Sequence, residues 1–121
     1  MFWQLLCFSL GDFEGNEVPV DQWMLERVGS VGTVKQIATV ATCSGTDEQA
    51  KLVRDTTGCS CEAMEGAAVV HTAKRLGAKA IEIRAISNTT GDRDSQEWNL
   101  DLALENLGIA VNQAITALWG E

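Results

Sequence analysis

Residues 34–43 read VKQIATVATC, and the chain continues as SGTDEQ through residue 49. The first part is rich in β-branched residues and nearly uncharged, which is typical of a buried strand. Thr46, with Gln49 three residues later, has the spacing of a helix capping box. The stretch therefore predicts a strand over 34–43, followed by a helix from Thr46 to about residue 55 that stops near Gly58.

The rest of the chain continues this alternation of strands and helices. We expect a short segment over 59–64, a helix over 65–76 that ends at Gly77, and a strand over 80–87 with alternating apolar and charged residues. After a polar loop over 88–97, a last helix is expected over 98–118. The order predicts an α/β fold, mostly a parallel sheet flanked by helices.

Both later helices carry a predicted apolar face. In the helix over 65–76 this face consists of Gly66, Val69, Val70, Ala73 and Leu76. In the last helix it consists of Leu100, Leu104, Leu107, Val111, Ala114 and Leu118. The first 33 residues are less regular, and the pattern over 18–27 fits either a short strand or a short helix.

The composition excludes several classes of protein. The 121 residues form a single domain by size, and 9 basic against 17 acidic residues give a net charge of −8, which argues against nucleic-acid binding. Four cysteines without paired C-x-x-C spacing and one histidine predict no metal site. No glycine-rich phosphate loop is present, so no cofactor is expected. The uncharged run over 1–10 lacks a basic segment and is too short to span a bilayer, so we expect a cytoplasmic protein without membrane contact.

Three short motifs contain residues that could carry chemistry. Glu65 precedes the small residues of a predicted helix, where the helix dipole alone would explain it, but a carboxylate there could also bind a diol. Arg84 shares a strand face with Glu82, which predicts an ion pair. Asn88 ends that strand, as a turn residue or as a donor and acceptor for a flat ligand. The charged loop over 91–94 is either solvated or a lid, and His71 is expected on a polar helix face.

These motifs together resemble a known family. The run EAMEGAA over 62–68 and RAISN over 84–88, about twenty residues later, resemble the purine nucleosidase and phosphorylase superfamily. The continuation NTTGDRD over 88–94 is most similar to futalosine hydrolases. These enzymes act in menaquinone biosynthesis and are relatives of the methylthioadenosine/S-adenosylhomocysteine nucleosidases. The likeness covers about residues 34–107 and is faint over 1–33.

The resemblance implies a substrate-binding role for matching positions. Glu65 would bind the ribose hydroxyls of a purine nucleoside, and Met64 would pack against the sugar. Asn88 would be the catalytic contact to the purine at N7, with Arg84 and Ser87 supporting the site. Relatives that prefer adenine carry Asp at the position of Asn88. Because an amide can donate to O6 and accept from N7–H, Asn88 favours a 6-oxopurine such as hypoxanthine.

The sequence also departs from the family pattern. Ala63 stands where futalosine hydrolases often have Asn, and the chain is about half of a usual family domain. The part without a match is the amino-terminal one, which in the family carries the glutamate that activates water; Glu14 and Glu17 are carboxylates in the corresponding stretch. We expect a carboxy-terminal half of a nucleosidase that is inactive alone because it lacks the glutamate that activates water. Alternatives are a non-catalytic nucleoside-binding or assembly module and a phosphorylase relative. A half sheet exposes an apolar edge, so a homodimer or higher oligomer is expected.

Overall fold

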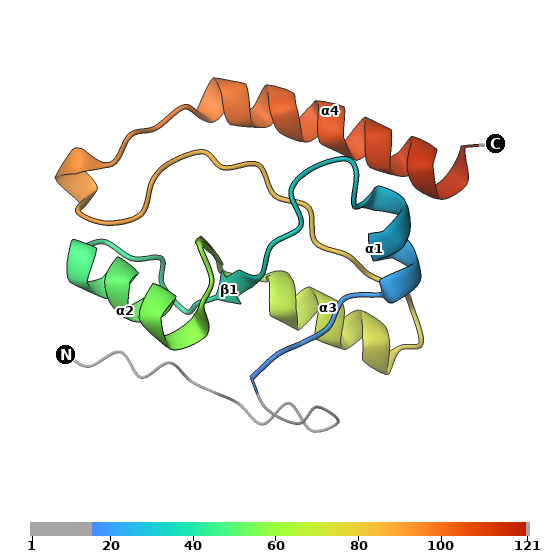
Figure 1. The fold of residues 1–121 in the computed structure, drawn as a ribbon, viewed down its shortest axis with the longest axis horizontal. Helices are drawn as coiled ribbons and strands as arrows, with labels where there is room; N and C mark the ends of the chain where they lie inside the picture. Colours follow the sequence, from blue (N-terminus) through green and yellow to red (C-terminus); the bar gives the residue numbers. More distant parts are fainter. Residues whose placement is uncertain (1–15, 121) are drawn as a thin grey trace.

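The computed structural model describes residues 16–120 (Figure 1). In chain order the elements are α1 (Gln22–Val28), β1 (Ile37–Thr39), α2 (Asp47–Thr57), β2 (Cys61–Ala63), α3 (Gly66–Arg75), a 3-10 turn (Arg93–Ser95) and α4 (Leu100–Trp119). The prediction of an α/β fold with parallel strands and flanking helices is confirmed. Glu14 and the apolar run over 1–10 lie outside the described residues.

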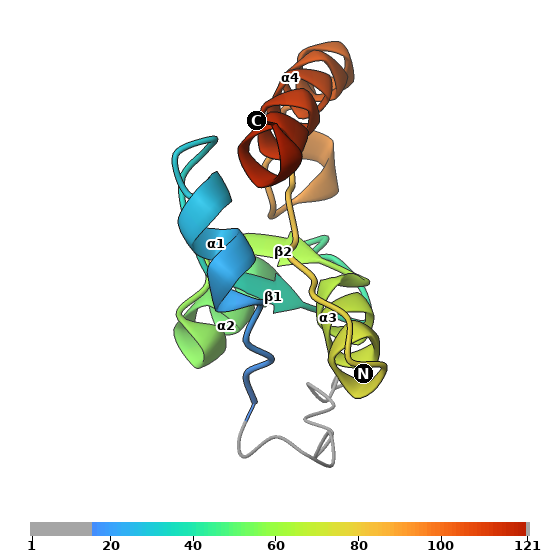
Figure 2. The ribbon, with the colours of Figure 1, turned by 90° about the vertical axis from the view of Figure 1, so that its right-hand side faces the viewer.

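The two strands and the helix between them form the centre of the molecule. β1 and β2 are parallel, with Ala38 opposite Glu62 and Thr39 opposite Ala63. Since a parallel pair needs a crossover connection, α2 links the two strands. Figures 1 and 2 show α2 and α3 on opposite sides of the strand pair, whereas α4 lies along another edge, where it packs against α1.

Local signals place the helices close to their predicted bounds. The Thr46 hydroxyl accepts a hydrogen bond from Gln49 N–H at 3.2 Å, and Gly58 ends α2 with a left-handed φ of 71°. Such a φ favours glycine because a Cβ would be strained there. The ambiguous pattern over 18–27 is a helix, α1, whose first turn is capped by the Asp21 carboxylate through Met24 N–H at 2.9 Å.

The prediction of a strand over 80–87 is wrong, because this segment pairs with neither β1 nor β2. This segment is not assigned to a strand, and in the part of the chain described here the sheet contains only β1 and β2. Residue 88 forms one isolated antiparallel bridge, to Trp98. The predicted strand over 34–43 is likewise shorter, because only Ile37–Thr39 faces a partner strand.

The core is made mainly of small side chains. The buried apolar residues are Val28, Ala38, Val40, Ala50, Ala63, Val70, Ala103 and Ala114. The predicted apolar faces are corrected accordingly. On α3, Gly66 and Val70 are buried but Val69 and Leu76 are exposed. On α4, Ala114 is buried and Leu107 and Leu118 are half-buried, whereas Leu100, Leu104 and Val111 are exposed. Much of the apolar surface of α4 therefore faces away from the described core.

Candidate functional site

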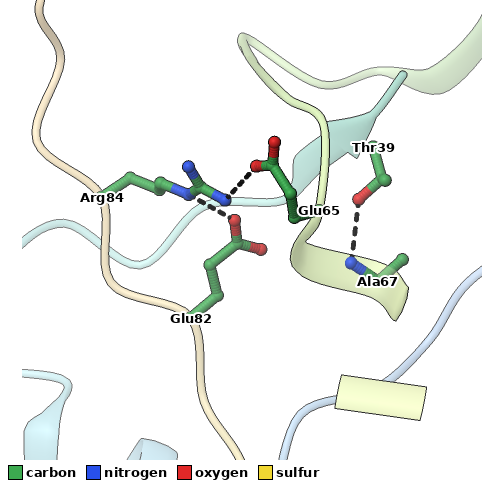
Figure 3. A network of polar contacts seen from close by, with 5 residues as sticks. All are labelled: Thr39, Glu65, Ala67, Glu82 and Arg84. Atoms are coloured by element: carbon green, nitrogen blue, oxygen red, sulfur yellow. Dashed lines mark hydrogen bonds and ion pairs between the residues drawn. The ribbon is translucent and has the colours of Figure 1, made fainter. Parts of the chain in front are cut away.

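The start of α3 brings Glu65 next to the end of β1. Glu65 is the N-cap residue of α3, yet its side chain makes no capping hydrogen bond. Thr39, the last residue of β1, takes that role instead: its hydroxyl accepts a hydrogen bond from Ala67 N–H at 3.0 Å (Figure 3). Because a strand residue satisfies this helix donor, the Glu65 carboxylate is available to face outward.

Arg84 lies between two carboxylates, as Figure 3 shows. Its Nε donates to Glu82 Oε1 at 2.7 Å, and its Nη2 donates to Glu65 Oε2 at 3.1 Å. The hydrogen bond to Glu82, followed by the contact with Glu65, raises the pKa of Arg84 against the opposing effect of burial. Arg84 is therefore a fixed cation beside Glu65. The expected ion pair between Arg84 and Glu82 is confirmed.

Gly66, the first residue of α3, makes room for the Glu82 carboxylate. A Cβ at this position would collide with all three atoms of that carboxyl group. The carboxylate thus lies at the amino end of a helix of 10 residues, where the helix dipole favours a negative charge. The glycine in the EGAA run is needed for this close approach.

Glu62, the first residue of the EAMEGAA run, joins β2 to the segment after β1 through its carboxylate. Ser44 is 5% exposed, and its N–H and hydroxyl donate to the two carboxylate oxygens of Glu62 at 2.7 Å each. The neighbouring thiol of Cys43 has a pKa raised by burial and then by the charges of Glu62 and Glu65, with Arg84 acting in the opposite direction. Sequence reasoning missed the Ser44–Glu62 contact, since nothing in the spacing of 18 residues predicts it.

Asn88 is held by its sequence neighbours. Ser87 Oγ donates to Asn88 Oδ1 at 2.8 Å, and Asn88 Nδ2 donates to the Thr89 carbonyl at 2.9 Å. An amide side chain has two N–H donors and two oxygen lone pairs. These two contacts use one of each and leave one of each for a ligand. The structure thus brings Ser87 and Asn88 together; the role of Asn88 toward a base stays a prediction.

The loop after Asn88 packs on the start of α2. Asp47 and Asp92 are joined reciprocally, each accepting the other's backbone N–H through Oδ1, at 3.3 and 3.2 Å. Gln96 reaches back to the carbonyl of Gly91 at 2.9 Å. Hydrogen bonds thus join the expected loop over 88–97 to the start of α2, and its function as a lid stays a prediction.

Other kinds of site find no support in the described residues. Within residues 16–120, no group of three or more His, Cys, Asp or Glu side chains could hold a metal ion, and no helix is long and apolar enough to cross a membrane. A hollow of about 250 Å³ lies between the segment leading into α1 and the helix α3, and its lining includes neither Glu65 nor Asn88. Met64, predicted to pack against a sugar, is exposed next to Glu65.

Comparison with known proteins identifies the family. Residues 27–119 match the phosphorylase superfamily, and this range is more than half of the chain. The chain belongs to the phosphorylase superfamily. Within this superfamily it is similar to futalosine hydrolases from three bacteria. It is 38% identical to that of Acidothermus cellulolyticus over 96 residues, which cover 78% of this chain and 39% of the relative.

Two further futalosine hydrolases give the same result. The identity is 37% with that of Streptomyces coelicolor, over 68% of this chain and 35% of the relative, and 39% with that of Thermus thermophilus, over 64% and 34%. The matched part thus spans between a third and two fifths of the length of these curated relatives. No solved structure matches the chain.

Proposed function

We propose that this chain binds a 6-oxopurine nucleoside and belongs to a nucleosidase that cleaves the N-glycosidic bond and releases hypoxanthine. The observation that carries the proposal is the Glu65 carboxylate, which is exposed to a ligand yet held in place by Arg84. Similarity to three futalosine hydrolases supports futalosine as the substrate. With that substrate, the chain would act in menaquinone biosynthesis.

Glu65 and Met64 are proposed to hold the ribose. One carboxylate can accept hydrogen bonds from two neighbouring hydroxyls, and an exposed thioether beside it can pack against the sugar ring. Departure of the base leaves positive charge on the sugar, and a carboxylate at the diol stabilises that charge while fixing the sugar in position. Arg84 stays bound to the other side of this carboxylate.

Asn88 is proposed to recognise the base. The remaining N–H donor of its amide would bind O6. The remaining lone pair of its oxygen would accept N7–H after solvent water has given a proton to N7 of the departing hypoxanthine. Adenine carries a donor in place of O6, so this arrangement disfavours it. The Thr89 carbonyl, which can only accept a hydrogen bond, keeps the amide from rotating to the opposite pattern.

Hydrolysis also requires a group that activates water. The carboxylates suggested by the sequence are Glu14, which lies outside the described residues, and Glu17, whose Oε1 accepts from Gln36 Nε2 at 3.4 Å. We propose that neither performs this step and that the chain alone binds nucleoside without hydrolysing it.

The exposed apolar residues of α4 support the expected self-association, which light scattering during gel filtration would measure.

The first experiment measures hypoxanthine release from futalosine and inosine by the purified chain, with methylthioadenosine as control, while calorimetry follows binding. Binding of the two 6-oxopurine nucleosides without release supports the proposal. Release without phosphate would mean a complete hydrolase, and release that depends on phosphate would mean a phosphorylase. Absence of both binding and release would contradict the proposed function.

A pair of variants tests the ribose contact. Glu65→Ala is expected to weaken inosine binding about tenfold or more, the effect of losing about 1.4 kcal/mol, and to leave hypoxanthine binding unchanged. Glu105→Ala, at an exposed position of α4, is the matched control. Equal losses of affinity for inosine and for hypoxanthine would contradict the proposed contact between Glu65 and the ribose.

A further inference from the structure

Glu82 has no role in the site described so far beyond its ion pair with Arg84. We propose that Glu82 is a positioning residue: it fixes the Arg84 guanidinium so that Arg84 holds Glu65 in the orientation that receives the ribose diol. The ribose part of this inference rests on the proposed function. The contact part, from Glu82 through Arg84 to Glu65, stands on geometry alone.

The two carboxylates bind different nitrogens of the guanidinium. Glu82 binds Nε at 2.7 Å and Glu65 binds Nη2 at 3.1 Å. Because Nε carries a single N–H, a short bond to it fixes the plane of the guanidinium, and the donors on Nη2 are then directed as well. The shorter bond therefore sets the direction of the longer one.

Exposure changes stepwise along the three side chains. The Glu82 side chain is 16% exposed, that of Arg84 is 40% exposed and that of Glu65 is 64% exposed. An ion pair as exposed as Arg84–Glu65 is screened by water, so the contact with Glu65 does not by itself immobilise Arg84. The better-shielded bond from Glu82 is the contact that can immobilise Arg84.

The surroundings of Glu82 hold its carboxylate in place. Gly66 leaves the space that the carboxylate occupies at the amino end of α3, where the helix dipole favours its charge. Thr39 occupies Ala67 N–H, one of the first donors of that helix. Glu65 is thus released from capping while Glu82 is fixed against the helix start, which gives the two carboxylates different roles.

The contact is tested in the ligand-free protein. Proton–nitrogen NMR of arginine side chains follows the Arg84 Nε–H in the parent chain, Glu82→Ala, Glu82→Gln and the control Glu105→Ala, with Arg84→Lys assigning the signal. We expect Glu82→Ala to shift the signal and speed its hydrogen exchange at least tenfold, and Glu82→Gln, which keeps an acceptor, to give an intermediate effect. An unchanged signal in Glu82→Ala would overturn the inference whatever the chain binds.

The ribose part is tested by the affinity for inosine relative to hypoxanthine in the same variants. We expect Glu82→Ala to lower this ratio about fivefold to tenfold, with partial recovery in Glu82→Gln and none of this effect in Glu105→Ala. If the parent chain binds inosine and Glu82→Ala binds it equally well, the positioning role is wrong and the proposed function stands. If the parent chain binds no nucleoside, the proposed function and the ribose part both fall. Equal far-ultraviolet circular dichroism shows that the variants are folded.

Discussion

Removal of the Glu62 carboxylate should destabilise the fold strongly, although Glu62 belongs to no proposed ligand contact. In Glu62→Ala, the N–H and hydroxyl of buried Ser44 both lose their acceptor. A buried donor left unpaired costs about 1–3 kcal/mol. The hydroxyl can rotate toward another acceptor whereas the backbone N–H cannot, so we expect a total loss of about 2–4 kcal/mol. For a domain whose free energy of unfolding is about 5–15 kcal/mol, this is a large fraction.

Two milder variants make this prediction specific. Glu62→Gln keeps one acceptor oxygen, and Ser44→Ala removes only the hydroxyl, so each should lose about 1–1.5 kcal/mol. Urea unfolding followed by tryptophan fluorescence measures these losses, with Glu105→Ala as the control for loss of a surface carboxylate. A loss below about 1 kcal/mol in Glu62→Ala would refute the reasoning, as would strict additivity of Ser44→Ala and Glu62→Ala in the double variant.

Three further results are expected. With the other cysteines replaced by serine, Glu65→Gln should speed alkylation of Cys43 at a fixed pH, because the pKa of this thiol is raised by burial and then by the Glu62 and Glu65 charges, and less negative charge means more thiolate; an unchanged rate would contradict this. Asn88→Asp should shift binding from hypoxanthine toward adenine, measured by calorimetry, and a constant ratio would sink the base-recognition proposal. Gly91→Ala should lower stability by about 1–3 kcal/mol in thermal unfolding, since φ is 110° and the new Cβ would meet the Asp47 carboxylate; an unchanged melting temperature would count against it.

Local chemistry in the sequence predicts the helices well. Thr46, Gln49 and Gly58 act on residues no more than four positions away, and α2 begins and ends where these residues predict. Strand pairing is different because it depends on segments far apart in the chain. The alternation over 80–87 indicates an extended backbone, but alternation carries no information about which strand, if any, lies alongside. The predicted apolar face of α4 is wrong for a related reason. A helical period shows which side of the helix is apolar, but it does not show which other element covers that side.

The contacts of the candidate site likewise differ in whether the sequence predicts them. The Arg84–Glu82 pair follows from a two-residue spacing, and the Ser87–Asn88 contact joins adjacent residues. The bond from Arg84 to Glu65 spans 19 residues and depends on how α3 lies against the extended segment, so the residues alone do not predict it. Family resemblance places both residues in one site without giving the geometry that joins them.

The bridge between Asn88 and Trp98 lies where the loop over 89–97 begins and ends. Backbone hydrogen bonds from Asn99 N to the Ser87 carbonyl at 2.8 Å and from Thr89 N to the Glu97 carbonyl at 3.2 Å close the base of this loop. A change of length or sequence at the tip is therefore expected to leave the amide of Asn88 where it is. For protein engineers the tip is therefore a segment that can be exchanged: replacing the residues between Thr89 and Glu97 varies the surroundings of Asn88 and retains this residue, the proposed contact to the base.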